Sequence, residues 1–151
     1  MKIFLDTADV SFIKPAYETG LIDGVTTNPS LILKSGRQLL EVIDELSKFQ
    51  NLQSISAEVV AETAEEMLSE AKKFYSIAPS VTIKVPCTIE GLKACKFLSG
   101  NGIQTNVTLV FSVAQAILVS KAGATFISPF VGRWMDNSVD GIKLIKNIRK
   151  A

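Results

Sequence analysis

The sequence alternates six times between a short apolar run and an amphipathic stretch with helical spacing. A chain that repeats strand and then helix brings each strand back in the same direction, so it builds a parallel sheet. Runs such as Val81–Val85 lack polar alternation, which is typical of parallel strands covered on both faces. We therefore expect an α/β protein. The expected strands are Lys2–Asp6, Gly24–Asn28, Ser54–Val60, Val81–Val85, Ile103–Thr108 and Thr125–Val131.

Capping signals agree with helices between these strands. Thr63 and Glu66 have the spacing of a capping box, in which each side chain accepts a hydrogen bond from the other residue's backbone N–H. Ser112 and Gln115 repeat this spacing. Glycines at 100 and 123 stand where two helices should end, because glycine readily takes the left-handed conformation.

A parallel sheet can be an open, doubly wound sheet or a closed barrel, and polar residues at the ends of the expected strands favour the barrel. A doubly wound dinucleotide-binding fold usually has G-x-G-x-x-G after its first strand, and this signature is missing. A barrel gathers the carboxyl ends of all its strands around one mouth, where its active site forms. We therefore predict a TIM-type (β/α)8 barrel. The polar residues at these strand ends are Asp6, Asn28, Glu58, Lys84, Thr108 and Ser128.

The number of β/α units is small for such a barrel. About six can be counted, and the last helical stretch, Val139–Ala151, reaches the end of the sequence. An eight-stranded barrel needs two further strands, without which the first and sixth strands keep unpaired backbone edges. The length of 151 residues suits one domain. We expect residues 1–151 to form a single, incomplete barrel domain.

The absence of histidine narrows the possible chemistry. It excludes Ser-His-Asp and Cys-His nucleophilic schemes, histidine-ligated zinc and imidazole acid–base catalysis. Lysine, carboxylates, hydroxyls and arginine remain. The two cysteines, Cys87 and Cys95, have no metal-like spacing, and we expect them to be reduced and structural. No metal site is expected.

Charge and hydropathy give no sign of a nucleic-acid or membrane partner. The net charge is +1, and no basic stripe is visible. No apolar run reaches the ~18 residues that suggest a membrane span. Asp6 follows Met1 too closely for a signal peptide. We expect a cytoplasmic protein that binds neither nucleic acid nor membrane.

Lys84 interrupts an otherwise apolar strand, Val81–Val85. A lysine in a covered strand faces either the barrel lumen or an apolar environment. Loss of solvent disfavours the ammonium form and leaves a nucleophilic amine that can form a Schiff base with a carbonyl. The alternative is a lysine that protects an edge strand or reaches the surface.

Two carboxylates, like Lys84, belong to otherwise apolar expected strands. Asp6 ends one strand, and Glu58 lies within another. Schiff-base aldol chemistry needs a base near the breaking C–C bond and a proton relay for loss of water. The alternative for either acid is a buried structural ion pair. Arg133, just past a strand end, could bind a phosphate or could simply be a surface residue.

Five segments, in this order along the chain, resemble the transaldolase family, in particular its small-subunit branch of transaldolases and fructose-6-phosphate aldolases. This resemblance covers the whole chain and implies a family member that lacks about the last quarter. It also implies a homo-oligomer. The segments are Phe4–Thr7, Val25–Ser30, Lys84–Pro86 with Thr88 and Glu90–Leu92, Thr105–Ser112, and Ile127–Arg133.

The resemblance assigns roles to individual residues. Lys84 matches the Schiff-base lysine and Asp6 the acid–base carboxylate. Glu58 and Thr108 match the pair that holds the catalytic water. The positions that match substrate-binding residues are Thr26, Asn28 and Asn106 around the dihydroxyacetone portion, together with Ser128, Phe130 and Arg133.

The reaction that the resemblance implies is a transaldolase reaction on sugar phosphates in the pentose phosphate pathway, with no cofactor. Fructose-6-phosphate aldolases resemble one another in having Gln where this chain has Glu58, and Tyr where it has Phe130, so the pair here resembles the transaldolase combination. One alternative is aldolase activity with release of free dihydroxyacetone. A second is a non-catalytic remnant or an assembly fragment, because two barrel units are lacking.

Overall fold

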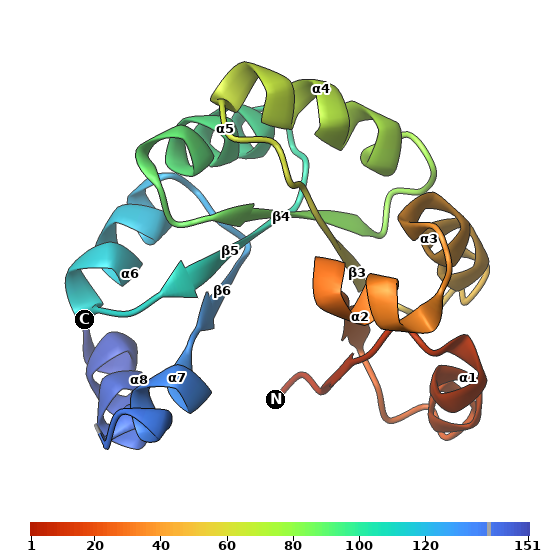
Figure 1. Cartoon of the computed structure of the whole chain (residues 1–151), viewed down its shortest axis with the longest axis horizontal. Coiled ribbons are helices and arrows are strands. Elements are labelled where there is room, and N and C mark those ends of the chain that lie inside the picture. Colours follow the sequence, from red (N-terminus) through yellow and green to blue (C-terminus); the bar gives the residue numbers. More distant parts are fainter. Residues whose placement is uncertain (139) are drawn as a thin grey trace. The chain divides into compact units, whose positions relative to one another are not determined.

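The computed structural model describes residues 1–138 and 140–151 (Figure 1). The chain divides into two compact units. The first unit comprises Met1–Ala61 and Ser69–Ile83, and the second comprises Glu62–Leu68 and Lys84–Ala151. The prediction of one domain over residues 1–151 stays a prediction. The expected last helix was placed from Val139, which lies outside the described residues.

Six parallel strands, each followed by helix, make up the α/β fold. Their order in the sheet follows their order in the chain, from β1 to β6. A doubly wound sheet reverses its strand order at a switch point, whereas a (β/α) barrel keeps the chain order throughout. The predicted TIM-type topology, with six units present, is confirmed. The strands are β1 (Phe4–Asp6), β2 (Gly24–Thr26), β3 (Ser54–Glu58), β4 (Val81–Pro86), β5 (Thr105–Val110) and β6 (Phe126–Pro129).

Eight helices follow the strands within the described residues, and two of the β/α units contain two helices each. Strand β2 is followed by both α2 and α3, and strand β6 is followed by both α7 and α8. The helices are α1 (Val10–Glu18), α2 (Pro29–Ser35), α3 (Leu39–Ser47), α4 (Ala64–Tyr75), α5 (Ile89–Gly100), α6 (Val113–Lys121), α7 (Val131–Asp136) and α8 (Gly141–Lys150).

The predicted helix starts are confirmed in one case and half confirmed in the other. Thr63 N donates to Glu66 Oε2 at 3.4 Å and Glu66 N donates to Thr63 Oγ1 at 3.3 Å, a complete capping box. Gln115 N donates to Ser112 Oγ at 3.1 Å. The Gln115 side chain, however, accepts from Phe111 N at 2.8 Å, one residue before the predicted partner. It therefore ties the end of β5 to the start of α6.

Both predicted helix stops are confirmed, although only one of the two glycines takes the left-handed conformation. Gly123 follows the C-cap of α6 with a φ of 86°, as expected of a left-handed glycine. Gly100 is instead the last residue of α5, Asn101 is the C-cap, and Gly102 takes the left-handed conformation with a φ of 75°. The left-handed turn after α5 therefore falls at Gly102, two residues beyond the last helical residue.

The core of the first unit lies between α1, α3 and the first three strands. Its residues are buried aliphatic side chains whose loss of solvent stabilises the unit, at ~25 cal/mol per Å² of apolar surface. Tyr17 and Phe49 close one side, with ring centroids 4.7 Å apart. The buried members are Val10, Ile13, Val25, Val42, Leu46, Leu52 and Ile55.

The second unit has its own buried residues, from β4, β5, α5 and α6. Helix α5 lies unusually close to the end of β4, because a Cβ on Gly91 would come within 2.0 Å of the Pro86 carbonyl oxygen. This contact fixes the start of α5 against the strand that carries Lys84. The buried residues are Val85, Ala94, Cys95, Leu98, Val107, Val110 and Val119.

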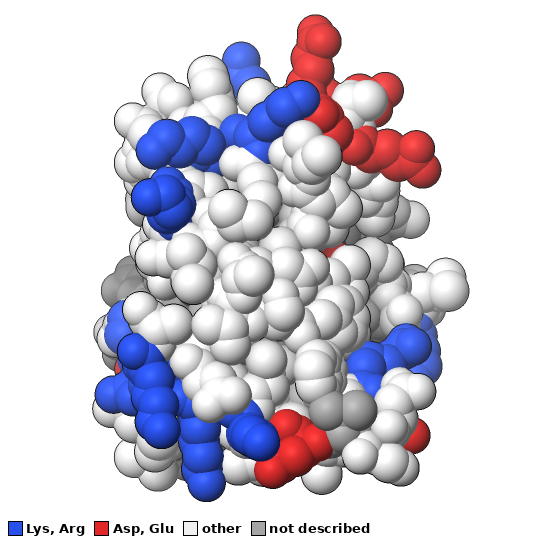
Figure 2. All heavy atoms as spheres, turned by 90° about the vertical axis from the view of Figure 1, so that its left-hand side faces the viewer, with Lys and Arg blue, Asp and Glu red and all other residues white. Residues whose placement is uncertain are grey.

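Charged side chains are unevenly spread over the face shown in Figure 2. Lysine and arginine gather in its upper and lower parts, with a broad uncharged area between them. Across residues 1–138 and 140–151, no helix combines the length and the apolar character needed to cross a bilayer. The absence of a nucleic-acid partner stays a prediction.

Candidate active site

Lys84 lies in β4, which has β3 and β5 as neighbours in the sheet. The alternative of a lysine on an edge strand is therefore wrong. The residue is 7% exposed, and its chain neighbours Ile83 and Val85 are both 0% exposed, so it does not reach the surface either. The role of Lys84 as a nucleophile stays a prediction.

Asp6 and Thr26 meet at the carboxyl ends of β1 and β2 in the first unit. They are partners in the parallel register, and Thr26 Oγ1 donates a hydrogen bond of 2.7 Å to Asp6 Oδ1. Asp6 is exposed, so the alternative of a buried structural ion pair is wrong for this residue. The Thr26 hydroxyl thus holds one oxygen of the Asp6 carboxylate, and the acid–base role of Asp6 stays a prediction.

Asn28 and Glu58 also belong to the first unit, at the ends of β2 and β3. Asn28 is the N-cap of α2, and its Oδ1 accepts from Leu31 N at 2.9 Å. The predicted strand Gly24–Asn28 is therefore two residues too long, because Asn28 and the following Pro29 start a helix. Glu58 is half-buried and lines a hollow of about 370 Å³ with Gln38 and Lys73 among its other walls.

In the second unit, Asn106 and Thr108 lie within β5 and Ser128 lies within β6. Ser128 Oγ donates to Asn106 Oδ1 at 2.9 Å. Asn106 is 3% exposed and Thr108 is 1% exposed. Thr108 Oγ1 has no hydrogen-bond partner among the residues that the structure describes. A buried hydroxyl without a partner is costly, so this oxygen is suited to bind a water molecule or a substrate group.

Phe130 and Arg133 follow β6 in the second unit. The predicted strand Thr125–Val131 ends earlier, at Pro129, because α7 begins at Val131 with Phe130 as its N-cap. The Phe130 and Phe111 rings are in contact at a tilt of 50°, with centroids 5.6 Å apart. Arg133 is exposed and lines a hollow of about 190 Å³ together with Phe111, Trp134 and Asn137.

The predicted site residues are thus divided between the two units, and each unit brings some of them together. The first contains the hydrogen-bonded pair of Asp6 and Thr26, and the second contains the pair of Asn106 and Ser128. The end of the lysine-bearing strand is tied to β5, because Cys87 N donates to the Thr108 carbonyl at 2.9 Å. Burial raises the pKa of the Cys87 thiol. The assembly of the predicted site residues into one active site stays a prediction.

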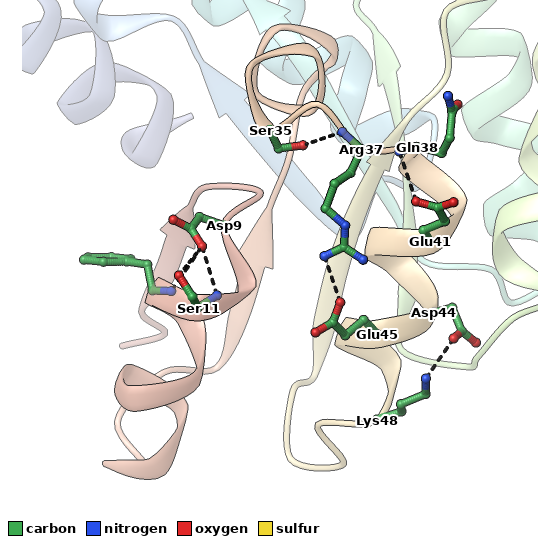
Figure 3. A network of polar contacts seen from close by, with 10 residues as sticks. Asp9, Ser11, Ser35, Arg37, Gln38, Glu41, Asp44, Glu45 and Lys48 are labelled. Carbon is green, nitrogen blue, oxygen red and sulfur yellow. Dashed lines mark hydrogen bonds and ion pairs between the residues drawn. The ribbon is translucent and has the colours of Figure 1, made fainter.

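A polar network that the sequence did not predict lies in the first unit, around a hollow of about 540 Å³ (Figure 3). Asp9 is the N-cap of α1, and the Ser11 hydroxyl donates to its carboxylate at 2.6 Å, which lowers the Asp9 pKa. Arg37 pairs with Glu45 at 2.8 Å. These contacts hold the start of α1 and the connection between α2 and α3, so we assign them a structural role.

No cluster of three or more potential metal ligands occurs in the part of the chain that the structure describes. The predicted site residues include four charged groups: one lysine, one arginine and two carboxylates, each from a different β/α unit. This set suits covalent and acid–base chemistry on a carbonyl substrate.

Comparison with known proteins identifies relatives over nearly the whole chain. The family model described as Transaldolase/Fructose-6-phosphate aldolase matches residues 3–151. A "Probable transaldolase" of Paracoccus denitrificans (strain Pd 1222) is 56% identical over 150 residues, which are 99% of this chain and 69% of that protein. Another from Geotalea daltonii (strain DSM 22248 / JCM 15807 / FRC-32) is 56% identical over 149 residues, with the same two coverages of 99% and 69%.

Proposed function

Because this chain belongs to the transaldolase/fructose-6-phosphate aldolase family, we propose that it transfers a dihydroxyacetone unit between sugar phosphates through a Schiff base on Lys84. The donor is sedoheptulose 7-phosphate and the acceptor is glyceraldehyde 3-phosphate, giving erythrose 4-phosphate and fructose 6-phosphate in the pentose phosphate pathway. The observation that carries the proposal is the burial of Lys84, at 7% exposure, in a central strand of the sheet.

The first half of the reaction forms the imine. The Lys84 amine attacks the ketose carbonyl carbon, and the resulting carbinolamine loses its hydroxyl as water. Glu58 supplies the proton for that departure through a water molecule that Thr108 also holds. The buried Thr108 hydroxyl, with no partner among the described residues, supports this role because it can bind that water.

The second half breaks the C–C bond. Asp6 takes the proton from the C4 hydroxyl, the C3–C4 bond breaks, and its electron pair moves into the iminium to form an enamine on Lys84. The aldose product leaves. The enamine carbon then attacks the acceptor aldehyde, Asp6 returns its proton to the new alkoxide, and water hydrolyses the imine. The lysine imine itself holds the electron pair, so this scheme needs no cofactor.

Substrate contacts are proposed for the remaining predicted residues. Thr26, Asn28 and Asn106 would hold hydroxyls of the dihydroxyacetone portion, and the hydrogen bonds that orient Thr26 and Asn106 support this. Ser128 and Arg133 would contact the substrate and its phosphate, since an exposed guanidinium binds phosphate oxygens well. Phe130 would border the sugar. We propose a cytoplasmic homo-oligomer as the working form.

The experiment that tests the proposal compares two products. The protein is given fructose 6-phosphate with and without erythrose 4-phosphate, and glyceraldehyde 3-phosphate and free dihydroxyacetone are measured. We expect glyceraldehyde 3-phosphate only when the acceptor is present. Release of free dihydroxyacetone in the same amount with and without erythrose 4-phosphate would instead identify an aldolase. No product from either mixture would identify a non-catalytic chain.

A matched pair of lysine variants makes the assignment specific. Lys84→Met should abolish turnover because the nucleophile is lost. Lys96→Met removes an exposed lysine of α5 in the same unit and should leave turnover unchanged. Equal activity of the two variants would contradict the role of Lys84.

A further inference from the structure

Strand β5 contains an irregularity at its carboxyl end, next to a residue of the proposed site. Leu109 has a φ of 59°, inside a strand and in a residue that carries a full side chain. A large non-glycine residue in this left-handed region is strained, so the surrounding structure must hold it there. Its side chain is 38% exposed, so burial of the leucine does not explain the conformation.

The register between β5 and β6 locates the irregularity. Asn106 is opposite Phe126 and Val107 is opposite Ile127, but Val110 is opposite Pro129. Strand β5 thus advances three residues while β6 advances two. One extra residue is inserted between Val107 and Val110, which is a β-bulge. Bulges of this kind reorient side chains and are common beside active sites.

Backbone hydrogen bonds hold the residues on either side of Leu109, and their donors lie just past the ends of β4 and β6. Before Leu109, the Thr108 carbonyl accepts from Cys87 N at 2.9 Å. After it, the Val110 carbonyl accepts from Phe130 N at 3.0 Å. Leu109 stands between these two anchors. A regular strand here would place Val110 opposite Phe130, whereas it lies opposite Pro129.

We propose that Leu109 is a positioning residue: its left-handed backbone ends the regular pairing of β5 and holds the Thr108 hydroxyl in place. This rests on the proposed function, in which Thr108 holds the water that assists dehydration of the carbinolamine. Leu109 does not itself touch the reacting atoms in this account. Its effect is on the rate of imine formation and not on the affinity for the sugar phosphate.

The experiment measures how fast fructose 6-phosphate becomes fixed to Lys84 when borohydride is added at successive times, over a range of substrate concentrations. Leu109→Ile is the disruptive variant, because β-branching disfavours the left-handed conformation. Leu109→Asn is the conservative rescue, because asparagine tolerates it. Leu118→Ile, at an exposed position in α6 of the same unit, is the control for the leucine-to-isoleucine change.

We expect Leu109→Ile to lower the limiting rate by about tenfold or more while the half-saturating concentration changes by less than about threefold. Leu109→Asn should stay within about threefold of the unsubstituted protein, and Leu118→Ile should match it. An unchanged rate in Leu109→Ile, with a normal Lys84 adduct in the unsubstituted protein, would overturn the positioning role alone. No adduct in the unsubstituted protein would overturn the proposed function.

The backbone can also be tested without a substitution. The φ of residue 109 in the unsubstituted protein is measured by NMR coupling constants. This measurement tests the left-handed conformation even if Leu109→Ile does not fold. A positive φ supports the bulge. A negative φ would overturn the inference whatever the kinetic result.

Discussion

Replacement of Gly91 by alanine should destabilise the protein, because there is no room for a methyl group at this position. Gly91 is buried in the first turn of α5, and an added Cβ would lie 2.0 Å from the Pro86 carbonyl oxygen and 3.2 Å from Thr88 Oγ1. The nearest obstacle is backbone and cannot rotate away. Relief therefore requires α5 to move outward from the end of β4.

The magnitude follows from two opposing effects. Overpacking of this kind costs roughly 1–3 kcal/mol, and the rigid Pro86 carbonyl places the cost of the added methyl group at about 3 kcal/mol. Alanine in place of glycine in a helix recovers about 1 kcal/mol. The expected net loss of unfolding free energy is about 2 kcal/mol. Movement of α5 would also disturb the end of β4, two residues beyond Lys84, so activity should fall as well.

Gly100→Ala is the matched control, because it makes the same change at the other end of the same helix. Gly100 has no heavy atom within 4 Å of the position of an added Cβ and no positive φ. The helix propensity gain alone should raise the stability by up to about 1 kcal/mol. Urea unfolding followed by circular dichroism measures both variants. Shifts of the two midpoints in the same direction would refute the close approach of α5 to β4.

Three further predictions concern the second unit. The Lys93 ammonium and, to a lesser extent, Ala64 N lower the Glu90 pKa, so ionised Glu90 favours the folded state above its unfolded pKa and this benefit is lost as the pH falls through the folded pKa. Glu90→Gln should therefore weaken the decline of stability below about pH 4 in acid titrations; an identical decline would contradict the contact. Burial raises the Cys87 pKa, so iodoacetamide should alkylate Cys87 more slowly than free cysteine at about pH 8 by peptide mapping, and faster reaction would show an accessible thiolate. Ser112→Ala removes the N-cap of α6 and should cost about 1 kcal/mol in urea unfolding, whereas Ser112→Gly should cost less.

The architecture could be predicted because it depends on patterns that repeat along the chain. Six apolar runs separated by helical stretches fix the parallel topology, and polar residues at strand ends favour a barrel. Strand ends were less predictable. The carboxyl end of β2 is decided by the side chain of Asn28, which caps α2, and such a cap competes with the strand for the same residues.

Predictions for single residues succeeded where burial followed from the neighbours. Lys84 is surrounded in sequence by apolar residues, so its burial could be inferred. The left-handed conformation of Leu109 could not be predicted, because leucine rarely adopts it and the register shift between β5 and β6 is seen only in the structure. Gly100 is the last residue of α5 as predicted, but the left-handed turn falls at Gly102, since a glycine near a helix end is permitted to turn but is not compelled to do so.

The central claim, a covalent bond between the buried lysine of β4 and the substrate ketone, is tested most directly by locating that bond. The protein is incubated with fructose 6-phosphate, reduced with borohydride, digested and analysed by peptide mass spectrometry. We predict a single reduced adduct, on Lys84, and none in Lys84→Met under the same conditions. An adduct on any other lysine, or the same adduct yield in Lys84→Met, would contradict the account.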